Sequence, residues 1–502
     1  MMEGISQLLP EAFNAGLSLV MFLVFLAYHL GLVVYRLFFA PLAGFPGPKI
    51  AAVTGLYEFY YDYVKNGSYL YRIEQMHRDY GPIVRVNPEE LSIDDADFYN
   101  EIYVVESKRR TDNYHAFAKG LGFDDSHFIT DKHDLHRRRR KPLEPFFSRA
   151  GVRRLTPMLN DCARRLLARL EQLKGTDTIV RLDHVFAALT GDVMRNICTE
   201  SDESYLDDPN FSPEWYTKAN FPPWRLLTRV RFNTLESIAL SMPIFVNLPL
   251  LIRIVALIPK SILLWAFPGG NAMMSKAHIL DAKRAKEQAD AGGGVAEIHT
   301  SIFRHVMSSD MPESEKSTER LSREAQILLG GGSVTTGRLF DFISYYIMAN
   351  DNIRGRLSRE LRHLTAGFPE QIPTFDELEK LPYMHAVIKE GLRQASVGMS
   401  AYFMHSDPKI YPEPDKFIPD RWLGDYNPLM DRNWVPFTKG SRQCLGMHLA
   451  TAELYIVLAC IFRPGGPKLE LFETDETDVK LVHDFMLPLP KLDSKGLRVM
   501  VK

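Results

Sequence analysis

The chain has 502 residues, of which 46% are hydrophobic and 24% are charged, a composition typical of a globular protein. It therefore excludes disordered and low-complexity classes for the chain as a whole. Sixty basic and 62 acidic side chains leave a net charge of −2, so no basic excess points to nucleic acid as a partner. Four cysteines in 502 residues are too few for a disulfide scaffold, and the lack of a Cys-x-x-Cys pair argues against a structural zinc site.

The first forty residues predict a membrane anchor. Residues 12–35 contain no Asp, Glu, Lys or Arg, and a helix needs roughly 20 such residues to cross a bilayer. Glu11 precedes the span and Arg36 follows it, which places the rest of the chain in the cytosol by the positive-inside rule. A buried core helix is the alternative. We expect three segments in order: a lumenal N-terminus over 1–11, a transmembrane signal anchor over 12–39 and a Pro/Gly-rich hinge over 40–50.

The remaining residues, 51–502, predict a mainly α-helical domain with a small β-sheet region. Apolar residues recur at helical spacing in four segments, 155–173, 321–350, 353–364 and 383–394. Short strand-like runs occur at 83–86 and 91–93, and the glycine-rich residues 291–295 predict a loop. Prolines and charges interrupt the apolar stretch 243–267, so it is either core or a segment that dips into the membrane interface.

A motif around Cys444 carries the strongest chemical signal. Residues 437–446 read Phe-Thr-Lys-Gly-Ser-Arg-Gln-Cys-Leu-Gly, and a cysteine thiolate can be the axial ligand of heme iron. Apolar residues after Cys444 recur at helical spacing, so the sulfur would lie at a helix N-terminus, where the helix dipole favours negative charge. Gly440 and Gly446 leave room for backbone N–H groups near the sulfur.

Two further side chains of this motif suit a heme. Arg442 can pair with a heme propionate, and Phe437 can cover the face of the ring. The other cysteines, Cys162, Cys198 and Cys460, lie in no comparable motif, and we expect them to be buried and inert.

The motif resembles the heme-binding loop of the cytochrome P450 family of heme-thiolate monooxygenases, and the resemblance covers almost all of the chain after the anchor. It implies a mainly α fold with heme b (iron protoporphyrin IX), Cys444 as the axial iron ligand, and NADPH used indirectly through an NADPH–cytochrome reductase. It also implies a single-pass protein of the endoplasmic reticulum membrane and a lipophilic small-molecule substrate. Fungal members of secondary metabolism are the most similar, with a terpenoid or polyketide as the expected substrate.

Residues 390–393 match the Glu-x-x-Arg motif of that family, and Arg421 follows within Pro-Asp-Arg-Trp. The spacing of Glu390 and Arg393 places both side chains on one face of a helix. The resemblance implies a buried structural network of Glu390, Arg393 and Arg421. Taken alone, the motif would indicate only an exposed helix ion pair.

Residues 331–336, Gly-Gly-Ser-Val-Thr-Thr, resemble the oxygen-activating segment of the family. Thr335 and Thr336 are the expected catalytic residues, with Thr335 able to hydrogen-bond iron-bound oxygen. Val334 occupies the place of the usual acid, so water or backbone groups must replace a carboxylate in proton delivery.

The basic run at 136–141 matches the helix of the family that contacts the heme propionates. His136 takes the place of the usual Trp, and Arg140 that of the Arg four residues later. Both are expected to bind propionates. The other basic residues of the run would face an acidic electron-donor protein.

One departure from the family concerns the join between Arg393 and Arg421, which are separated by 27 residues, a few tens fewer than usual. The missing block would supply a substrate-contacting loop, strands of the small sheet and a propionate partner. Residues 397–403 resemble the end of that strand region. Two alternatives to the monooxygenase therefore stay open: a non-catalytic heme-binding or inactive remnant and, less favoured, a heme-thiolate isomerase or dehydratase that uses a peroxide substrate.

Overall fold

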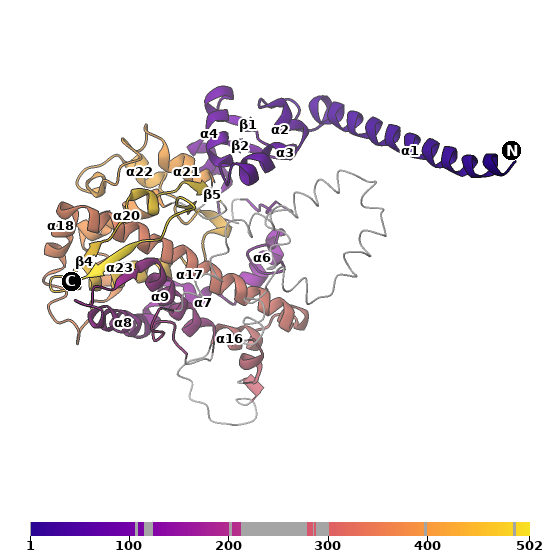
Figure 1. The fold of residues 1–502 in the computed structure, drawn as a ribbon. Coiled ribbons are helices and arrows are strands. Elements are labelled where there is room, and N and C mark those ends of the chain that lie inside the picture. The colour runs from indigo at the N-terminus through magenta and orange to yellow at the C-terminus, as the bar shows by residue number, and fades with distance from the viewer. Residues whose placement is uncertain are drawn as a thin grey trace. The chain divides into compact units, whose positions relative to one another are not determined.

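The computed structural model describes residues 2–105, 109–114, 124–199, 203–211, 279–284, 286–287, 301–395, 399–484 and 488–502. The described residues form two compact units, one up to Asp94 and one from Asp95 onward. The chain is mainly helical with small sheets, as predicted (Figure 1). The apolar stretch 243–267 and the predicted loop 291–295 lie outside the described residues.

The first unit begins with a long apolar helix. Helix α1 (Met2–Val34) continues into the short π-helix η1 (Tyr35–Phe39). Residues Leu19–Phe39, 21 in all, form a stretch that is long and apolar enough to cross a membrane, and none of it is buried. Helical structure thus runs through the predicted span 12–39 and also includes residues 2–11.

The rest of the first unit is a set of short helices and one hairpin: α2 (Lys49–Val53), α3 (Leu56–Phe59), η2 (Tyr60–Val64), α4 (Tyr69–Tyr80), β1 (Ile83–Arg85) and β2 (Leu91–Ile93). Strands β1 and β2 pair antiparallel, at the two places predicted from sequence. The segment predicted as a hinge is bonded to β1, because the Arg85 N–H donates to the Pro46 carbonyl over 2.8 Å. A Cβ at Gly47 would lie 2.5 Å from the Arg85 carbonyl O, so glycine is needed for this close approach.

The second unit holds most of the helices. Its described α-helices are α5 (Ala96–Ile102), α6 (His133–Arg140), α7 (Glu144–Phe147), α8 (Arg149–Gln172), α9 (Leu182–Cys198), α16 (Ile302–Ser308), α17 (Thr318–Ala349), α18 (Asp351–Leu361), α19 (Phe375–Leu378), α20 (Pro382–Gln394), α21 (Met399–Ser406), α22 (Pro428–Arg432) and α23 (Met447–Phe462). Its short 3₁₀-helices are η3 (Glu313–Lys316), η4 (Pro419–Trp422), η5 (Gly440–Arg442) and η6 (Glu476–Asp478). The four helices predicted from apolar periodicity correspond to α8, α17, α18 and α20.

Two small antiparallel sheets complete the second unit. In the larger one, β7 (Arg498–Val501) lies between β3 (Ile179–Arg181) and β4 (Leu469–Leu471). The other is the pair β5 (His483–Asp484) and β6 (Pro488–Leu489).

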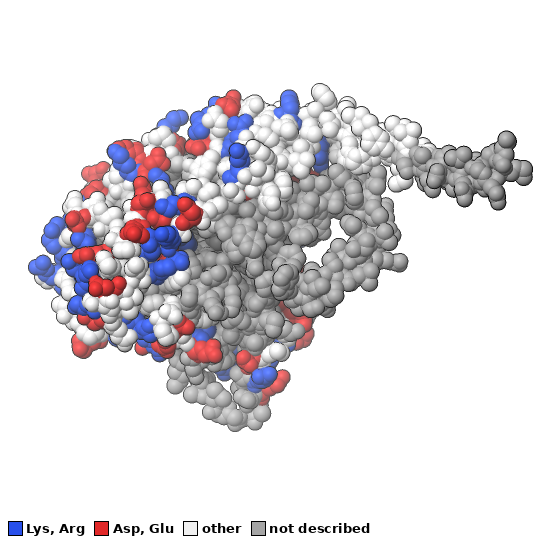
Figure 2. Space-filling model, in the orientation of Figure 1, with Lys and Arg blue, Asp and Glu red and all other residues white. Residues whose placement is uncertain are grey.

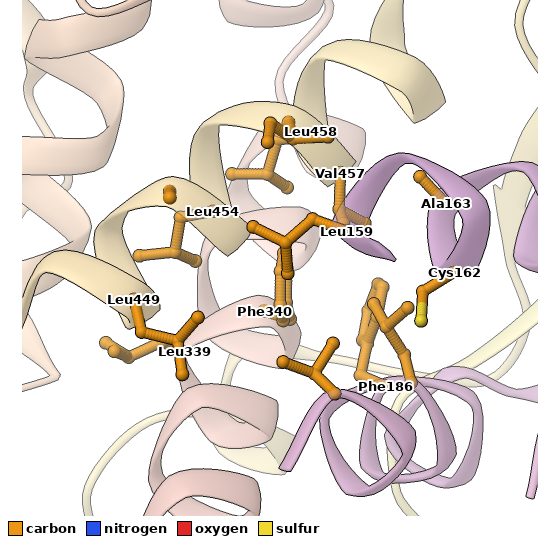
Figure 3. Close-up of a cluster of buried hydrophobic side chains, with 14 of the residues drawn as sticks. Leu159, Cys162, Ala163, Phe186, Leu339, Phe340, Leu449, Leu454, Val457 and Leu458 are labelled. Atoms are coloured by element: carbon orange, nitrogen blue, oxygen red, sulfur yellow. The ribbon is translucent and has the colours of Figure 1, made fainter. Parts of the chain in front are cut away.

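The core of the second unit lies between α8, α9, α17, α20 and α23. Figure 3 shows apolar side chains from α8, α9, α17 and α23 converging there. The Phe186 and Phe340 rings stack with centroids 5.0 Å apart, which joins α9 to α17. A Cβ at Gly391 would lie 2.3 Å from Ile343 Cγ1, so glycine permits the close packing of α20 on α17. The site described below rests on these helices.

The segment after the short join is helical, not extended. Residues 397–403 were expected to end a strand region, but residues 399–406 form α21. Described residues 393–395 and 399–421 contain no strand. A strand without a neighbour would leave its N–H and C=O groups unpaired, whereas a helix pairs them within the segment. The strand expectation is therefore wrong for residues 399–403.

Lys and Arg side chains are interspersed with Asp and Glu over the charged part of the face in Figure 2. Surface ion pairs such as Arg153 with Asp376, at 2.8 Å, reflect this mixing. Each such pair contributes only ~0–1 kcal/mol. The surface charges therefore add little to stability.

Candidate functional site

Cys444 lies in a tight loop that leads into α23. The Cys444 N–H donates to the Phe437 carbonyl over 3.0 Å, which closes the loop. Gly440 has a φ of 78°, and a Cβ there would lie 2.6 Å from the Val104 carbonyl O. Both features require glycine. The loop therefore places Cys444 just before the N-terminus of α23, as the motif predicts.

The surroundings of the Cys444 sulfur favour a thiolate more than those of the other cysteines. Burial raises the pKa of the Cys444 thiol, but the N–H groups of Gly446 and Met447 and the Arg140 guanidinium oppose that rise. The Cys444 residue still has accessible surface, so the burial that acts on its pKa comes from the protein atoms around it. Cys162, Cys198 and Cys460 are buried, and burial is the largest cause that raises the pKa of each of these thiols.

Helix α6 brings Arg140 and His136 to the Cys444 loop. Arg140 Nη1 donates to the Gln443 carbonyl over 2.7 Å, and Arg140 Nε donates to Glu144 over 3.1 Å. His136 is 3% exposed. Burial, followed by the nearby Arg442 charge, lowers the pKa of His136 to about 3. His136 is therefore a neutral imidazole beside two guanidinium groups.

Arg442 is held by the segment before α6. Its Nη1 and Nη2 donate to the carbonyls of Thr130 and Asp131 over 2.8 and 2.6 Å. His136 Nδ1 and Arg442 Nε are buried and have no hydrogen-bond partner within the described part of the chain. Buried imidazole and guanidinium nitrogens need such partners.

A heme fits this set of donors. Its two propionates are carboxylate acceptors for guanidinium and imidazole N–H groups, and its iron accepts a thiolate. Arg140, Arg442, His136 and Cys444 come together from α6 and the 437–446 loop. Phe437 is half-buried and packs against the main core, so the predicted ring contact remains a prediction.

Thr335 and Thr336 both lie on α17, but their side chains have different surroundings. Thr336 is 2% exposed and belongs to the core side of the helix. The half-buried Thr335 hydroxyl donates to the Gly331 carbonyl over 2.7 Å. One turn of α17 is also contacted from α9, because the Thr190 hydroxyl lies 3.0 Å from the Ser333 carbonyl. Of the two threonines, only Thr335 is not buried, and its role beside a ligand stays a prediction.

Glu390, Arg393 and Arg421 lie together in a buried network. Arg393 Nε and Nη2 donate to the Glu390 carboxylate over 3.0 and 2.8 Å, and Arg421 Nε donates over 3.1 Å. Glu390 also accepts the Ile418 N–H at 3.1 Å and the Trp422 indole N–H at 2.9 Å. Glu390 is fully buried. Five donors thus surround one carboxylate, in keeping with a structural role.

Several contacts of the site could not be found from sequence. Trp422 follows Arg421 directly, so an indole N–H beside a buried carboxylate was a possible signal. The Thr130 and Asp131 groups that hold Arg442 are backbone carbonyls, which any residue type supplies. His405, described below, lies in no motif that was singled out.

The comparisons with known proteins agree with this geometry. A family model described as cytochrome P450 matches residues 57–399 and 394–464. Cytochrome P450 monooxygenase oblB of Aspergillus clavatus is 46% identical over 95% of this chain and 95% of its own length. The fusicoccadiene C-8 hydroxylase of Phomopsis amygdali is 45% identical over 94% of this chain and 93% of its own length. The fusicoccadiene C-8 hydroxylase of Alternaria brassicicola is 43% identical over 100% of this chain and 99% of its own length.

The same comparisons bear on the short join. The family match consists of two segments that overlap at residues 394–399, where the sequence shows the join. The alignment with the Alternaria brassicicola hydroxylase has 540 positions and this chain has 502 residues, so at least 38 positions lie opposite gaps in this chain.

Proposed function

Since this chain belongs to the cytochrome P450 family, and within it to the monooxygenases, we propose that it is a membrane-anchored heme-thiolate enzyme of fungal terpenoid metabolism. It would insert one oxygen atom from O₂ into a lipophilic terpenoid, with electrons from NADPH passed through an NADPH–cytochrome reductase. The observation that carries the proposal is the Cys444 loop, where two backbone N–H groups and Arg140 offset the burial of the sulfur. A polyketide substrate is less favoured, because the relatives named for their substrate act on fusicoccadiene.

Heme, when bound, supplies the activation of O₂. The residues of this chain would hold and orient it: Cys444 would bind the iron through its sulfur, and His136, Arg140 and Arg442 would bind the propionates. Gly446 contributes the N–H that stabilises the sulfur charge. Thr335 holds a proton on Oγ1 beside the Gly331 carbonyl and can turn this hydroxyl toward a ligand. Val334 has no ionisable group, so water or backbone groups would have to deliver protons to Thr335 in place of a carboxylate.

The N-terminal helix supports placement in the endoplasmic reticulum membrane as a single-pass protein with a cytosolic catalytic domain. Its stretch Leu19–Phe39 is unburied and apolar. Removing residues 1–40 and following the chain by membrane flotation tests this part. If the truncated chain floats with membranes as completely as the full chain, the anchor is wrongly assigned.

A second candidate, a heme-binding chain with little or no turnover, is favoured by the break in the family match at residues 394–399. The block absent there would contribute to the substrate pocket and the small sheet. Water entering beside the heme would then favour reductant consumption without product.

One experiment separates the two candidates. The whole chain and a version carrying the corresponding block of a relative are purified, and their carbon monoxide difference spectra are compared. Product formation from fusicoccadiene, as the probe, is then measured with reductase and NADPH. A thiolate band with product from the chain as it stands supports the monooxygenase, whereas a band with product only from the longer version supports the second candidate. Absence of a thiolate band in both versions contradicts Cys444 as the ligand.

A further inference from the structure

His405 links the two sides of the join to the Cys444 loop. It lies on α21, beyond the join from Arg393, and is 2% exposed. Its Nδ1 lies 3.0 Å from the Arg393 carbonyl O, and the Val435 N–H donates to its Nε2 over 2.8 Å. Because Nε2 accepts a hydrogen bond, the proton must be on Nδ1, which donates to the Arg393 carbonyl. One neutral imidazole therefore connects the last turn of α20 to Val435.

The carbonyl that His405 binds needs a partner from outside its helix. The last backbone bond of α20 runs from the Ala395 N–H to Gly391, so the Arg393 carbonyl has no donor within the helix. The link is reciprocal, since Arg393 Nη1 donates to the His405 carbonyl over 2.7 Å. These two bonds tie α21 to the end of α20.

A second contact, made by Trp434 next to Val435, also reaches helix α20. The Trp434 indole N–H donates to the Lys389 carbonyl over 3.1 Å, one helical turn before Arg393. The Lys389 ammonium lies over the Trp422 ring, 4.3 Å from its centroid, and pairs with Asp431. Trp434 and Val435 are thus held at two successive turns of α20.

Hydrogen bonds continue from Val435 toward the sulfur. The Thr438 N–H donates to the Val435 carbonyl over 3.1 Å, and the Cys444 N–H donates to Phe437 over 3.0 Å. A displacement of Val435 would therefore move the turn that closes around Cys444.

We propose that His405 is a positioning residue for Cys444, which sets the place of the 435–444 loop relative to α20 across the short join. The inference rests on the proposed role of Cys444 as heme ligand. Burial and the Arg393 guanidinium lower the pKa of His405 to about 3, although the Arg393 and Asn433 carbonyls favour the charged form. The Nε2 lone pair thus stays available to Val435 at neutral pH.

Two variants test the two hydrogen bonds of the His405 imidazole separately. His405→Asn keeps an amide N–H near the place of Nδ1, but its side chain is too short to accept from Val435. His405→Gln reaches Val435 with its amide oxygen. Hydrogen exchange at Val435 and peptide-resolved alkylation of Cys444 are measured on the heme-free full chain in detergent. We expect the Asn variant to lose about tenfold of the Val435 protection, the equivalent of one buried hydrogen bond, and to change the alkylation rate severalfold. The Gln variant should restore both.

His385→Asn is the matched control, because His385 lies on α20, the helix that His405 contacts, but bonds to the Tyr455 hydroxyl, at 2.6 Å. The inference is overturned if Val435 is unprotected in the parent chain, if the Asn variant protects it equally, or if His385→Asn gives the same changes. In the heme-loaded chain, the thiolate fraction of the carbon monoxide spectrum should fall in His405→Asn and return to the parent value in His405→Gln. Absence of a thiolate band in the parent chain, with the exchange results as expected, contradicts the proposed function and leaves the positioning intact.

Discussion

Replacing Glu390 should destabilise the chain far more than replacing a surface carboxylate. Glu390 is fully buried and accepts hydrogen bonds from Arg393, Arg421, Trp422 and the Ile418 N–H. In Glu390→Gln the shape is kept, but two buried guanidinium groups lose their counter-charge and an amide NH₂ faces N–H donors.

Breaking a buried ion pair by removing one partner costs ~3–5 kcal/mol, which is a large part of a typical stability of ~5–15 kcal/mol. The backbone carbonyls of His405, Pro414, Pro412 and Glu413 accept from the remaining arginine N–H groups, so the guanidinium groups stay hydrogen-bonded. We therefore expect the lower half of that range, about 3 kcal/mol.

The matched control is Glu379→Gln, because Glu379 pairs with Arg149 at the surface and its side chain is 33% exposed. Removing it should cost ~0–1 kcal/mol. Urea unfolding of the heme-free chain, followed by circular dichroism, gives both values. If Glu390→Gln shifts the midpoint no more than Glu379→Gln does, the network is not a stabilising element.

The remaining predictions concern the ligand, the hydroxyls of α17 and acid stability. Cys444→Ala should abolish the thiolate band of the carbon monoxide spectrum, whereas alanine at the other three cysteines should leave the band in place. Thr335→Ala should raise peroxide and lower product per NADPH consumed, while Thr336→Val, a change in the core, should alter thermal stability instead. Because the folded-state pKa values of His136 and His405, both about 3, lie below that of an unfolded histidine, their stabilisation is complete above pH ~6.5 and falls on acidification toward pH 3. Urea unfolding across that range should show that the free energy of unfolding falls by ~1.4 kcal/mol per pH unit for each histidine. His405→Gln should remove the contribution of His405 to this pH dependence.

Local sequence patterns were enough to predict the helices whose position depends only on an apolar face. The periodic segments 155–173 and 383–394 correspond to α8 and α20, since a helix with one apolar face needs only a core to pack on. The same holds for the Cys444 loop, whose glycines and following apolar helix are explicit in the sequence.

The sequence was insufficient where an element depends on distant partners. Residues 397–403 resemble the end of a strand region of the family, but residues 399–406 form α21. The carbonyls of Thr130 and Asp131 could not be identified as partners of Arg442, because backbone acceptors leave no trace in residue type. His405 was missed for a related reason: its two partners are backbone groups of Arg393 and Val435.

The contacts that stabilise the chain at the short join differ from the part of the family fold that would enclose a substrate. Arg393 lies before the join, and the carbonyls of His405 and Pro414 that accept from it lie after it. The Glu390 network and the Cys444 loop therefore obtain their partners from residues that this chain retains. By the family resemblance, the block expected at this place would belong to the pocket wall and the small sheet. A missing block would act on substrate enclosure and leave the Cys444 loop with its hydrogen bonds, so heme binding and turnover are to be measured separately in this protein.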